Sequence, residues 1–516
     1  MAPILAIPPF PGARLPRFAT ETNTTSSSDG LLAALAGQRV GGCYWGQQPA
    51  LPAAGYQLDG TASGSTGALA WPADADPWHL LAGAASVRLW AGDSRILLAL
   101  AAGCPVTEVQ ADGRASPPDA AAIKALLHSG LTGWRWHDPF SGEAISAAQA
   151  IMLAGFWRRL IDRNRPIVAA LGFAHWKQAN VAPLLWNGGG SPFRRSLPAS
   201  DAGTEVAVWR SRLTSAQTAA LAHSAAVVLE VEDGFIRSAG LGADCVPPLS
   251  VIVDAMGVHF DPGQPSELEN LLQNGEFAAD MLARAAALRS AIVAGGLSKY
   301  ERSAADHLPR PGGARRHVLV PGQVEDDRAV TSGGALASNL ELLRRARAAA
   351  GPDVYLIYKP HPDVLAGHRR GHIEAADMVA LADRVETTAP MAALIAMADE
   401  LHVNSSLAGF EALLRQKPVT VHGVPFYAGW GLTTDCGPVP ARRTARRTLD
   451  ELVAATLLLY PRYLDPLTGL PCPAEVLIAR LTTAAPSHDA RASAVIALRR
   501  ATGRVRAGAG RLLGRR

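Results

Sequence analysis

The residues best suited to chemistry in this chain follow short apolar runs in its second half. Lys359, His361 and Pro362 come directly after the run 354–358. The ligand crevices of open α/β sheets lie beyond the carboxyl ends of their strands, so a strand over this run would place the lysine and the imidazole in such a crevice. Both side chains are hydrogen-bond donors that suit a phosphate.

A second polar group follows the apolar run 400–403. Ser405 and Ser406 precede the helical pattern 407–415, and Ser406 is well placed as its N-cap. The free N–H groups and the dipole of a helix N-terminus attract anions, and Glu411, about one turn further on, can accept hydrogen bonds from both hydroxyls of a ribose. Serines before a helix are usually ordinary caps, but together with the His-Pro segment they favour a nucleotide-sugar site.

Carboxylates gather after two further apolar runs. Glu232 and Asp233 follow a run that ends at Val231, with Arg237 four positions beyond, so acids and a cation meet at a strand end. Three consecutive acids, at 325–327, follow another run. Such groups are often only solvated or paired at the surface. In an active site, however, a carboxylate serves as a base or as a nucleophile at an anomeric carbon.

The composition is that of a globular enzyme with several domains. The chain has 516 residues, of which 48% are hydrophobic, and a formal net charge of +4. It has no uninterrupted apolar run of the roughly eighteen residues that a membrane span needs, and its proline-containing start lacks the basic segment of a signal peptide. The five cysteines are scattered without a CxxC pair, so we expect neither a disulfide framework nor a zinc site, and we expect the cytoplasm as the compartment.

The last eighteen residues hold seven arginines and no acid. A basic tail of this kind lies on anionic lipid, at roughly 1 kcal/mol per basic residue near the surface, or stays solvated and disordered, and the sequence favours neither. Nucleic acid is not expected as a partner, because no aromatic-interleaved basic patch accompanies the tail.

Short apolar runs alternate with longer helical patterns from about residue 165 onward. This alternation predicts parallel sheets covered by helices. The segment 303–316, rich in proline, glycine and charge, is the expected connection between two such sheets. The arrangement fits two Rossmann-like domains that face a cleft, the GT-B architecture of glycosyltransferases. Residues 1–30, rich in proline, serine and threonine, are expected to be disordered or loosely attached.

Two short sequences recur in the same order along the chain. Cys104-Pro-Val-Thr107 parallels Lys417-Pro-Val-Thr420, and Asp138-Pro-Phe-Ser-Gly142 parallels Asp465-Pro-Leu-Thr-Gly469. The repeat predicts a degenerate, partial copy of a module before residue 160.

The proposed copy has lost the polar groups of the binding site. The first pair of repeats aligns Leu98 with Glu411, and the segment 91–93 with the segment 404–406. A site without these groups cannot hold a nucleotide, so a single module is expected to carry all the chemistry. The competing interpretation is an unrelated accessory domain.

The chain resembles the bacterial capsule β-Kdo transferases of the KpsC type, from the capsule synthesis family. The resemblance is nearly continuous from about residue 165 to 480. It is carried by eight motifs: Glu-Asp-Gly-Phe (232–235), Pro-Pro-Leu-Ser-Val-Ile-Val-Asp (247–254), Leu-Ser-Lys-Tyr (297–300), Gln-Val-Glu-Asp-Asp (323–327), Lys-Pro-His-Pro-Asp (359–363), Ser-Leu-Ala-Gly-Phe-Glu (406–411), Phe-Tyr-Ala-Gly-Trp-Gly (426–431) and Tyr-Pro-Arg-Tyr (460–463).

The resemblance implies a GT-B enzyme that transfers Kdo, a 3-deoxy-octulosonic acid, from CMP-β-Kdo with retained configuration. The product would be the β-Kdo linker of capsule polysaccharide, built on a phosphatidylglycerol-type lipid that already bears Kdo. Such an enzyme would work at the cytoplasmic face of the inner membrane, beside other capsule transferases such as a KpsS-type enzyme.

The resemblance also implies roles for individual residues. Asp327, which ends a Gln-x-x-x-Asp motif beginning at Gln323, would be the nucleophile of a double displacement, with Glu232 and Asp233 near the acid/base position. The CMP would be held by His361, Pro362, Ser405 or Ser406, and Glu411. Lys359 would assist at the phosphate, and Arg237 is a suitable partner for the carboxylate of Kdo.

Two features depart from the family pattern. Arg210 follows Trp209 where the family usually has glycine, and the chain has one complete module where KpsC proteins commonly have two. No Asp-x-Asp metal motif is placed at the site, so neither a metal nor any cofactor besides the donor is expected. The alternatives are a GT-B enzyme for another CMP-ulosonic acid such as CMP-sialic acid, a nucleotide-sugar epimerase, and a non-catalytic capsule assembly protein.

These observations predict an α/β chain with the following parts. The loosely attached start (1–30) is followed by the degenerate module (31–160), the acceptor-side Rossmann-like domain (161–310), the CMP-binding Rossmann-like domain (311–485) and the basic tail (486–516). The aromatic loop 424–433 suits structural packing and an acceptor platform equally well.

Overall fold

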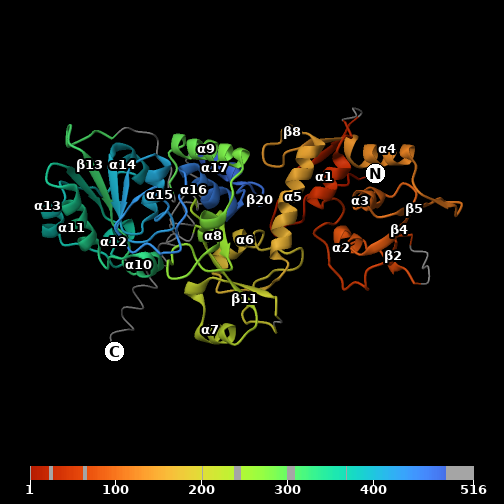
Figure 1. Ribbon diagram of the computed structural model, residues 1–516, viewed down its shortest axis with the longest axis horizontal. Helices are drawn as coiled ribbons and strands as arrows, with labels where there is room; N and C mark the ends of the chain where they lie inside the picture. The colour runs from red at the N-terminus through yellow and green to blue at the C-terminus, as the bar shows by residue number, and fades with distance from the viewer. Residues whose placement is uncertain are drawn as a thin grey trace. The chain divides into compact units, whose positions relative to one another are not determined.

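A computed structural model describes residues 2–22, 27–61, 67–199, 202–236, 246–298, 308–367 and 369–483 (Figure 1). Arg237 and the basic tail lie outside these residues. The chain divides into two compact units. Unit 1 holds residues 1–170, 178–205 and 465–471, and unit 2 holds residues 171–177, 206–464 and 472–516. None of the helices in the described ranges combines the length and the apolar character that crossing a bilayer requires.

One half of unit 2 is a parallel sheet with helices on both faces. Its strand order is β15-β14-β13-β16-β17-β18, and every neighbouring pair is parallel. The strands are β13 (His317–Pro321), β14 (Tyr355–Lys359), β15 (Arg384–Val385), β16 (Glu400–Val403), β17 (Val419–Val421) and β18 (Thr434–Asp435). The helices are α10 (Arg328–Gly333), α11 (Asn339–Ala350), α12 (Pro362–Leu365), α13 (Ala375–Leu381), α14 (Met391–Met397) and α15 (Leu407–Leu414).

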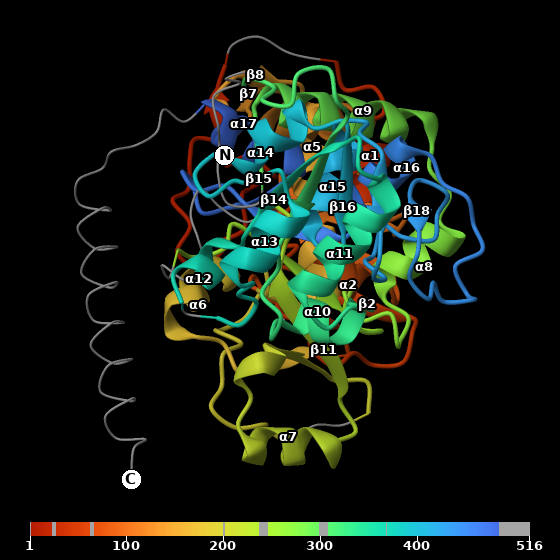
Figure 2. The same ribbon diagram turned by 90° about the vertical axis from the view of Figure 1, so that its left-hand side faces the viewer.

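The register of this sheet brings the predicted site segments together. Leu319 of β13 pairs with Ile357 of β14 and with Leu401 of β16, so the three strands end at the same edge. Helices α11 and α13 contact each other, as do α14 and α15, and Figure 2 shows α11 and α13 in front of the strands. The prediction of a parallel, Rossmann-like sheet is confirmed for this half.

The other half of unit 2 is a mixed sheet, and here the prediction of a parallel sheet is wrong. Strand β12 (Ser250–Asp254) is antiparallel to both β11 (Val227–Asp233) and β19 (Pro461–Leu464), with β10 (Glu205–Val208) beyond β11. In β11, apolar and acidic residues alternate from Leu229 to Glu232, which is typical of a strand with one polar face.

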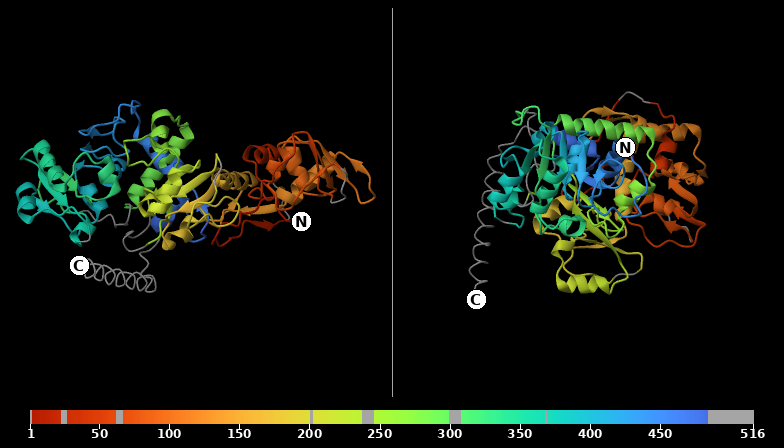
Figure 3. Two further views of the ribbon diagram at one scale, coloured as in Figure 1. Left: turned by 90° about the horizontal axis from the view of Figure 1, so that it is seen from below. Right: turned by 60° about the vertical axis from the view of Figure 1, so that its left-hand side comes forward.

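Helices surround the mixed sheet, and one of them lies apart from its core. Helix α7 (Ser215–Ala222) has no buried residue and lies at the margin of this half (Figures 2 and 3). The remaining helices of this half are α8 (Glu267–Asn274), α9 (Ala279–Ala294), α16 (Leu449–Val453) and α17 (Ala474–Thr483).

Unit 1 contains two sheets and five helices among its described residues. Its larger sheet has the order β3-β2-β4-β5-β6 and its smaller sheet the order β1-β7-β8. The strands are β1 (Ala19–Glu21), β2 (Tyr56–Asp59), β3 (Leu69–Ala70), β4 (Ala84–Trp90), β5 (Val106–Val109), β6 (Ala115–Ser116), β7 (Trp134–His137) and β8 (Ala144–Ile145). The helices are α1 (Leu31–Gln38), α2 (Pro77–Leu81), α3 (Arg95–Ala101), α4 (Ala120–Leu127) and α5 (Ala147–Asn164). The chain passes between the units within β9 (Ile167–Leu171), α6 (His175–Val181), β10 and β20 (Pro471–Cys472).

The start of the chain is packed into unit 1, so the expectation of a loosely attached start is wrong for its described residues. The side chains of Leu5, Phe10 and Phe18 are at most 7% exposed. Phe18 meets Trp136 edge to face at 5.4 Å between ring centroids. The apolar residues that alternate with the prolines supply enough buried surface to hold the segment in place.

The internal repeat is visible in the secondary structure. Two parts of the chain have the same order of elements: a helix, a π-helical turn, two strands and a second helix. In the first part these are α4, the turn at His128–Thr132, β7, β8 and α5. In the second part they are α16, the turn at Ala454–Leu459, β19, β20 and α17. π-Helical turns are rare, so their matching positions favour duplication over coincidence. The turns after β7 and β19 are also alike. The backbone N–H of Gly142 donates to the carbonyl of Asp138, and the backbone N–H of Gly469 donates to the carbonyl of Asp465; each N–O distance is 2.8 Å.

Candidate functional site

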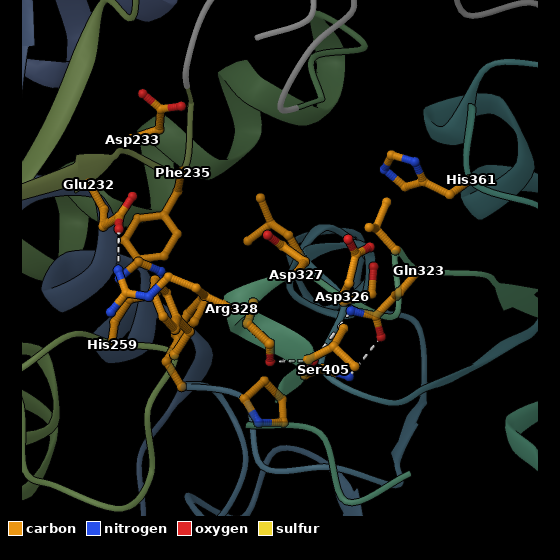
Figure 4. A pocket seen from close by; sticks show the side chains of 18 of the residues that line it. Glu232, Asp233, Phe235, His259, Gln323, Asp326, Asp327, Arg328, His361 and Ser405 are labelled. Atoms are coloured by element: carbon orange, nitrogen blue, oxygen red, sulfur yellow. Dashed lines mark hydrogen bonds and ion pairs between the residues drawn. The ribbon is translucent and has the colours of Figure 1, made fainter. Parts of the chain in front are cut away.

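A pocket of about 550 Å³ opens where the two sheets of unit 2 meet. Figure 4 shows side chains from both sheets pointing into it, with Asp327 between Glu232 and His361 in this view. Of the residues predicted from the sequence, seven line the pocket: Glu232, Asp233, Gln323, Asp327, His361, Ser405 and Ser406.

Gln323 fastens the loop after β13 to the start of α15. Its Oε1 accepts a hydrogen bond from the Ser405 N–H at 2.9 Å, and its Nε2 donates to the Ser405 hydroxyl at 3.2 Å. Its own N–H donates to the side chain of Asn339 at 2.8 Å. Both ends of the amide are therefore engaged, and Gln323 acts as a positioning residue.

The N-terminus of α15 retains groups that can bind an anion. The Ser406 hydroxyl caps the helix by accepting from the Ala408 N–H at 3.2 Å, as the sequence predicts. Among the described residues, the backbone N–H groups of Ser406 and Leu407 form no hydrogen bond, and both residues line the pocket. These two donors and the helix dipole favour a phosphate at this position.

Asp327 and its neighbour Asp326 differ in their surroundings. Asp326 forms an ion pair with Arg369, with Oδ1 at 3.2 Å from Nε. The Asp327 carboxylate forms neither an ion pair nor a hydrogen bond with the side chains in the described ranges, although its residue is the N-cap of α10. It is therefore the acid of this loop that is free to act on a ligand.

Glu232 lies on β11, opposite Asp327 across the pocket. Its Oε1 is 2.6 Å from Nη1 of Arg328, whose Nη2 is 3.2 Å from Oε2 of Glu230. Burial raises the pKa of Glu232 to about 7, although Arg328 opposes the shift. Asp233, by contrast, is paired with Lys177 at 3.0 Å. Glu232 is thus the group suited to exchange a proton near neutral pH.

Trp209 and Arg210, the position where the sequence departs from the family pattern, contact the charged residues around the acidic face of β11. The Lys177 ammonium lies 3.3 Å from the ring centroid of Trp209, and Arg210 forms an ion pair with Glu230. The arginine that stands in place of glycine therefore adds a cation to the acidic face of β11.

His361 presents a defined tautomer to the pocket. Its Nδ1 accepts a hydrogen bond from the Asp363 N–H at 3.2 Å, which caps α12. In the neutral ring the proton is then on Nε2, and Nε2–H is the donor of the ring.

Three predicted site residues do not line this pocket, which corrects the sequence interpretation. The Lys359 ammonium donates to the carbonyl of Ala389 at 2.7 Å. Pro362 is the first residue of α12 and shapes the turn. Glu411 lines a smaller cavity with Leu407 and Phe410, because positions 407, 410 and 411 share one face of the helix.

The aromatic loop after β17 packs the base of the site. The hydroxyl of Tyr427 donates to the Ser406 carbonyl, and the indole of Trp430 donates to the Phe426 carbonyl at 2.8 Å. Tyr427 and Trp430 are fully buried, and Phe426 also lines the pocket. Packing, the first of the two interpretations, accounts for most of this loop.

Two cationic residues of the pocket were not singled out by the sequence analysis. Arg328 directly follows the three consecutive acids, and Arg369 lies in the loop after α12. The rule that ligands bind beyond the carboxyl ends of parallel strands points to both loops, since one follows β13 and the other follows β14.

Comparison with known proteins places this site in a family. Residues 204–463 match the family model described as capsule polysaccharide biosynthesis protein. The chain is 39% identical over 343 residues to the capsule polysaccharide modification protein LipA of Neisseria meningitidis serogroup A, which covers 65% of this chain and 48% of the relative. It is 45% identical over 236 residues to the lipopolysaccharide-processing protein LpsZ of Rhizobium meliloti, covering 45% and 53%. The chain thus spans about half the length of the curated relatives it matches.

A solved structure gives the same assignment. The Thermosulfurimonas dismutans KpsC β-Kdo 2,4 transferase has a TM-score of 0.52 and 31% identity, covering 61% of this chain and 98% of that one. The β-Kdo 2,7 transferase of the same organism has a TM-score of 0.48 and 32% identity, with the same coverage. The fold of unit 2 is of the GT-B glycosyltransferase type. The chain belongs to the family of capsule polysaccharide biosynthesis proteins, as a member of the KpsC type.

Proposed function

We propose that the protein is a glycosyltransferase that transfers Kdo from CMP-β-Kdo with retention of configuration. The observation that carries the proposal is the pair of carboxyl groups in one pocket. Asp327, which has no ion pair among the described residues, lies on one wall, and Glu232, whose pKa is raised to about 7, lies on the other. The similarity to a structure named as a β-Kdo transferase supports the choice of sugar.

The donor side of the pocket suits a CMP leaving group. In this mechanism the N–H groups at the start of α15 and the Nε2–H of His361 donate to the phosphate, and these hydrogen bonds strengthen as negative charge develops on it. A phosphate leaving group needs no proton from a general acid. No metal or further cofactor is required for this step in the proposal.

The reaction proceeds by two displacements. The Asp327 carboxylate attacks the anomeric carbon as the bond to the CMP phosphate breaks, which gives a sugar–aspartate ester and free CMP. The acceptor hydroxyl then attacks the same carbon, its proton passes to Glu232, and Asp327 leaves as a carboxylate. Two inversions give net retention.

The acceptor in this proposal is a phosphatidylglycerol-type lipid that bears Kdo, and the product is the β-Kdo linker of capsule polysaccharide. In this proposal the protein is a peripheral enzyme at the inner face of the inner membrane, and a KpsS-type transferase is its partner. Membership of the capsule polysaccharide biosynthesis family supports this part.

The direct test is an incubation of the full chain with CMP-Kdo generated in situ and a lipid-like acceptor that carries one Kdo. We expect a product heavier by one Kdo, with a β-linkage in its NMR spectrum. Preferential transfer from CMP-sialic acid would show that the donor is CMP-sialic acid and not CMP-Kdo. Absence of transfer from either donor would support a non-catalytic role in capsule assembly.

A further inference from the structure

We propose that Arg369 binds the carboxylate of the donor sugar, exchanging its ion pair with Asp326 for one with the substrate. This inference rests on the proposed function, in which the donor is an ulosonic acid linked to CMP. An ulosonic acid carries a carboxylate on its anomeric carbon, so its binding residue must lie beside the nucleophile. Arg369 lines the same pocket as Asp327.

The backbone around Arg369 is fixed to the nucleophile loop. The N–H of Glu325 donates to the carbonyl of Arg370 at 3.1 Å. The side-chain amide of Asn339, a buried residue, donates to the carbonyls of Gln323 and Gly371 at 2.8 and 2.9 Å. The segment that carries Arg369 therefore has a defined position relative to Asp327.

The side chain of Arg369, in contrast, is held among the described residues only by an exposed ion pair with Asp326. The exposed fractions are 38% for Arg369 and 45% for Asp326. Exposed ion pairs contribute little to stability, because water solvates both charges and two side chains lose freedom. A guanidinium binds a carboxylate with two parallel hydrogen bonds, so a substrate carboxylate competes well for this group.

The other arginine that lines the described pocket is already committed. Arg328 joins Glu230 and Glu232 and lies over the ring of Phe260 at 5.1 Å. His361 lies beside α12, where its Nε2–H suits the phosphate. The phosphate is thus provided for by His361 and the start of α15, which leaves Arg369 for the second anion of the donor.

The test compares two neighbouring arginines in the full chain. Arg369→Met removes the charge at the pocket, and Arg370→Met removes the same charge at an exposed position whose side chain does not line it. The two measurements are the affinity for CMP, by calorimetry, and the KM for CMP-Kdo. CMP has the phosphate but lacks the sugar carboxylate.

We expect Arg369→Met to raise the KM for CMP-Kdo by about tenfold or more, since a charge-assisted hydrogen-bonded pair is lost. Its affinity for CMP should stay within about twofold of wild type, and Arg370→Met should change neither quantity. Arg369→Lys should recover part of the loss, because it restores the charge without the two parallel bonds.

Each contrary result has a distinct meaning. An unchanged KM in an Arg369→Met variant of normal melting temperature overturns the assignment of Arg369 alone. An equal loss of affinity for CMP and CMP-Kdo would show that Arg369 binds the phosphate, and would overturn its assignment to the sugar carboxylate. Failure of the wild type to bind CMP would overturn the proposed function and this inference with it.

Discussion

Arg328 links Glu232 to the loop of Asp327. The guanidinium of Arg328, the residue directly after Asp327, lies 2.6 Å from the carboxylate of Glu232 on the facing sheet. The candidate nucleophile and the candidate base are therefore connected by one side chain, and a shift of one sheet against the other would alter both. This pair also sets the charge state of the base, because Arg328 lowers the pKa that burial raises.

Transfer should show an acidic limb in its pH profile, with activity rising through about pH 7. Glu232 must be ionised to accept the proton of the acceptor, and its pKa is about 7, so activity is lost as pH falls below that value. Arg328→Met should move the limb to higher pH, because the cation that favours the charged form is gone.

Arg210→Met is the matched control for this shift. Arg210 pairs with Glu230 but not with Glu232, so the limb should stay in place. A limb that is unaltered in Arg328→Met would show that another group titrates.

Asp327→Asn should lower kcat by roughly a thousandfold or more, since an amide cannot form the sugar–enzyme bond. The melting temperature should change little, because the carboxylate is exposed and makes no ion pair among the described residues. Intact-mass spectrometry with donor alone should show an adduct of one Kdo on the wild type and none on the variant.

Asp326→Asn provides the control at the neighbouring position. Its carboxylate is engaged with Arg369, and the variant should retain most of the activity and form the adduct. An adduct that maps to Asp326, with full activity in Asp327→Asn, would exchange the roles of the two acids.

Transfer should not require a divalent metal, and EDTA should leave the rate unchanged. The phosphate is bound by His361 and the start of α15 in the proposed mechanism, and the sequence Asp74-Ala-Asp76 lies in unit 1, where Asp76 pairs with Arg158 at 2.9 Å. His361→Ala should weaken CMP binding and lower kcat by roughly tenfold to a hundredfold. Activity that EDTA abolishes and Mg²⁺ restores would contradict this site.

Local sequence patterns were sufficient to predict where the pocket lies. The carboxyl ends of parallel strands meet at one edge, so segments that follow β13, β14 and β16 had to converge. Ser406 could be predicted as a cap, since capping depends on residues two or three positions apart.

Long-range pairing and side-chain direction could not be predicted in this way. Strand β12 lies between β11 and β19, and the buried carboxylate of Asp254 accepts from the Tyr460 hydroxyl at 2.7 Å, which no local pattern indicates. Glu411 and Lys359 have suitable positions along the chain, but the rotation of α15 and the contact with Ala389 direct them away from the pocket.

The buried histidine pair of β16 and β17 should make stability depend on pH. Burial lowers the pKa of His422 to about 4, helped by His402, whose Nδ1 is 3.2 Å from its Nε2. In the unfolded chain His422 binds a proton near its ordinary pKa of 6.5, so stability is lost as pH falls from 6.5 towards 4.

The expected loss from this histidine is about 2 kcal/mol between pH 7 and pH 5. His422→Leu should reduce the difference in unfolding free energy between these two pH values by a similar amount. An equal dependence in wild type and variant would assign the effect to other groups.

Unit 1 should bind no nucleotide, so the full chain should bind one CMP. Its strand–helix–strand element β4–α3–β5 matches β16–α15–β17 in order, but β4 and β5 pair with a shift of one residue relative to the sequence alignment. Val87 pairs with Val106, whereas Leu401 pairs with Val419. Counted from β4 and β16, the strand register therefore aligns Leu97, rather than Leu98, with Glu411, and either residue is apolar.

The anion position of the copy is also filled by its own side chain. The carboxylate of Asp93 accepts from the Arg95 N–H at 2.9 Å, at the start of α3, and pairs with the Arg95 guanidinium at 2.6 Å. A phosphate would have to compete with the Asp93 carboxylate for the Arg95 N–H and the Arg95 guanidinium, which that carboxylate already occupies. The corresponding position in unit 1 therefore lacks the polar groups that CMP needs, and its anion-binding donors are occupied by Asp93.

Calorimetry with CMP should accordingly give a stoichiometry of one per chain, and the product should contain one type of Kdo linkage. An alternating linker would then require a partner transferase. The full chain is the right material, because residues 465–471 belong to unit 1 and a chain that begins near residue 160 would remove their neighbours. In Asp327→Asn both CMP binding and its stoichiometry should persist while all transfer is lost. Two bound CMP molecules, or a second linkage that survives in Asp327→Asn, would show that unit 1 carries an active site of its own.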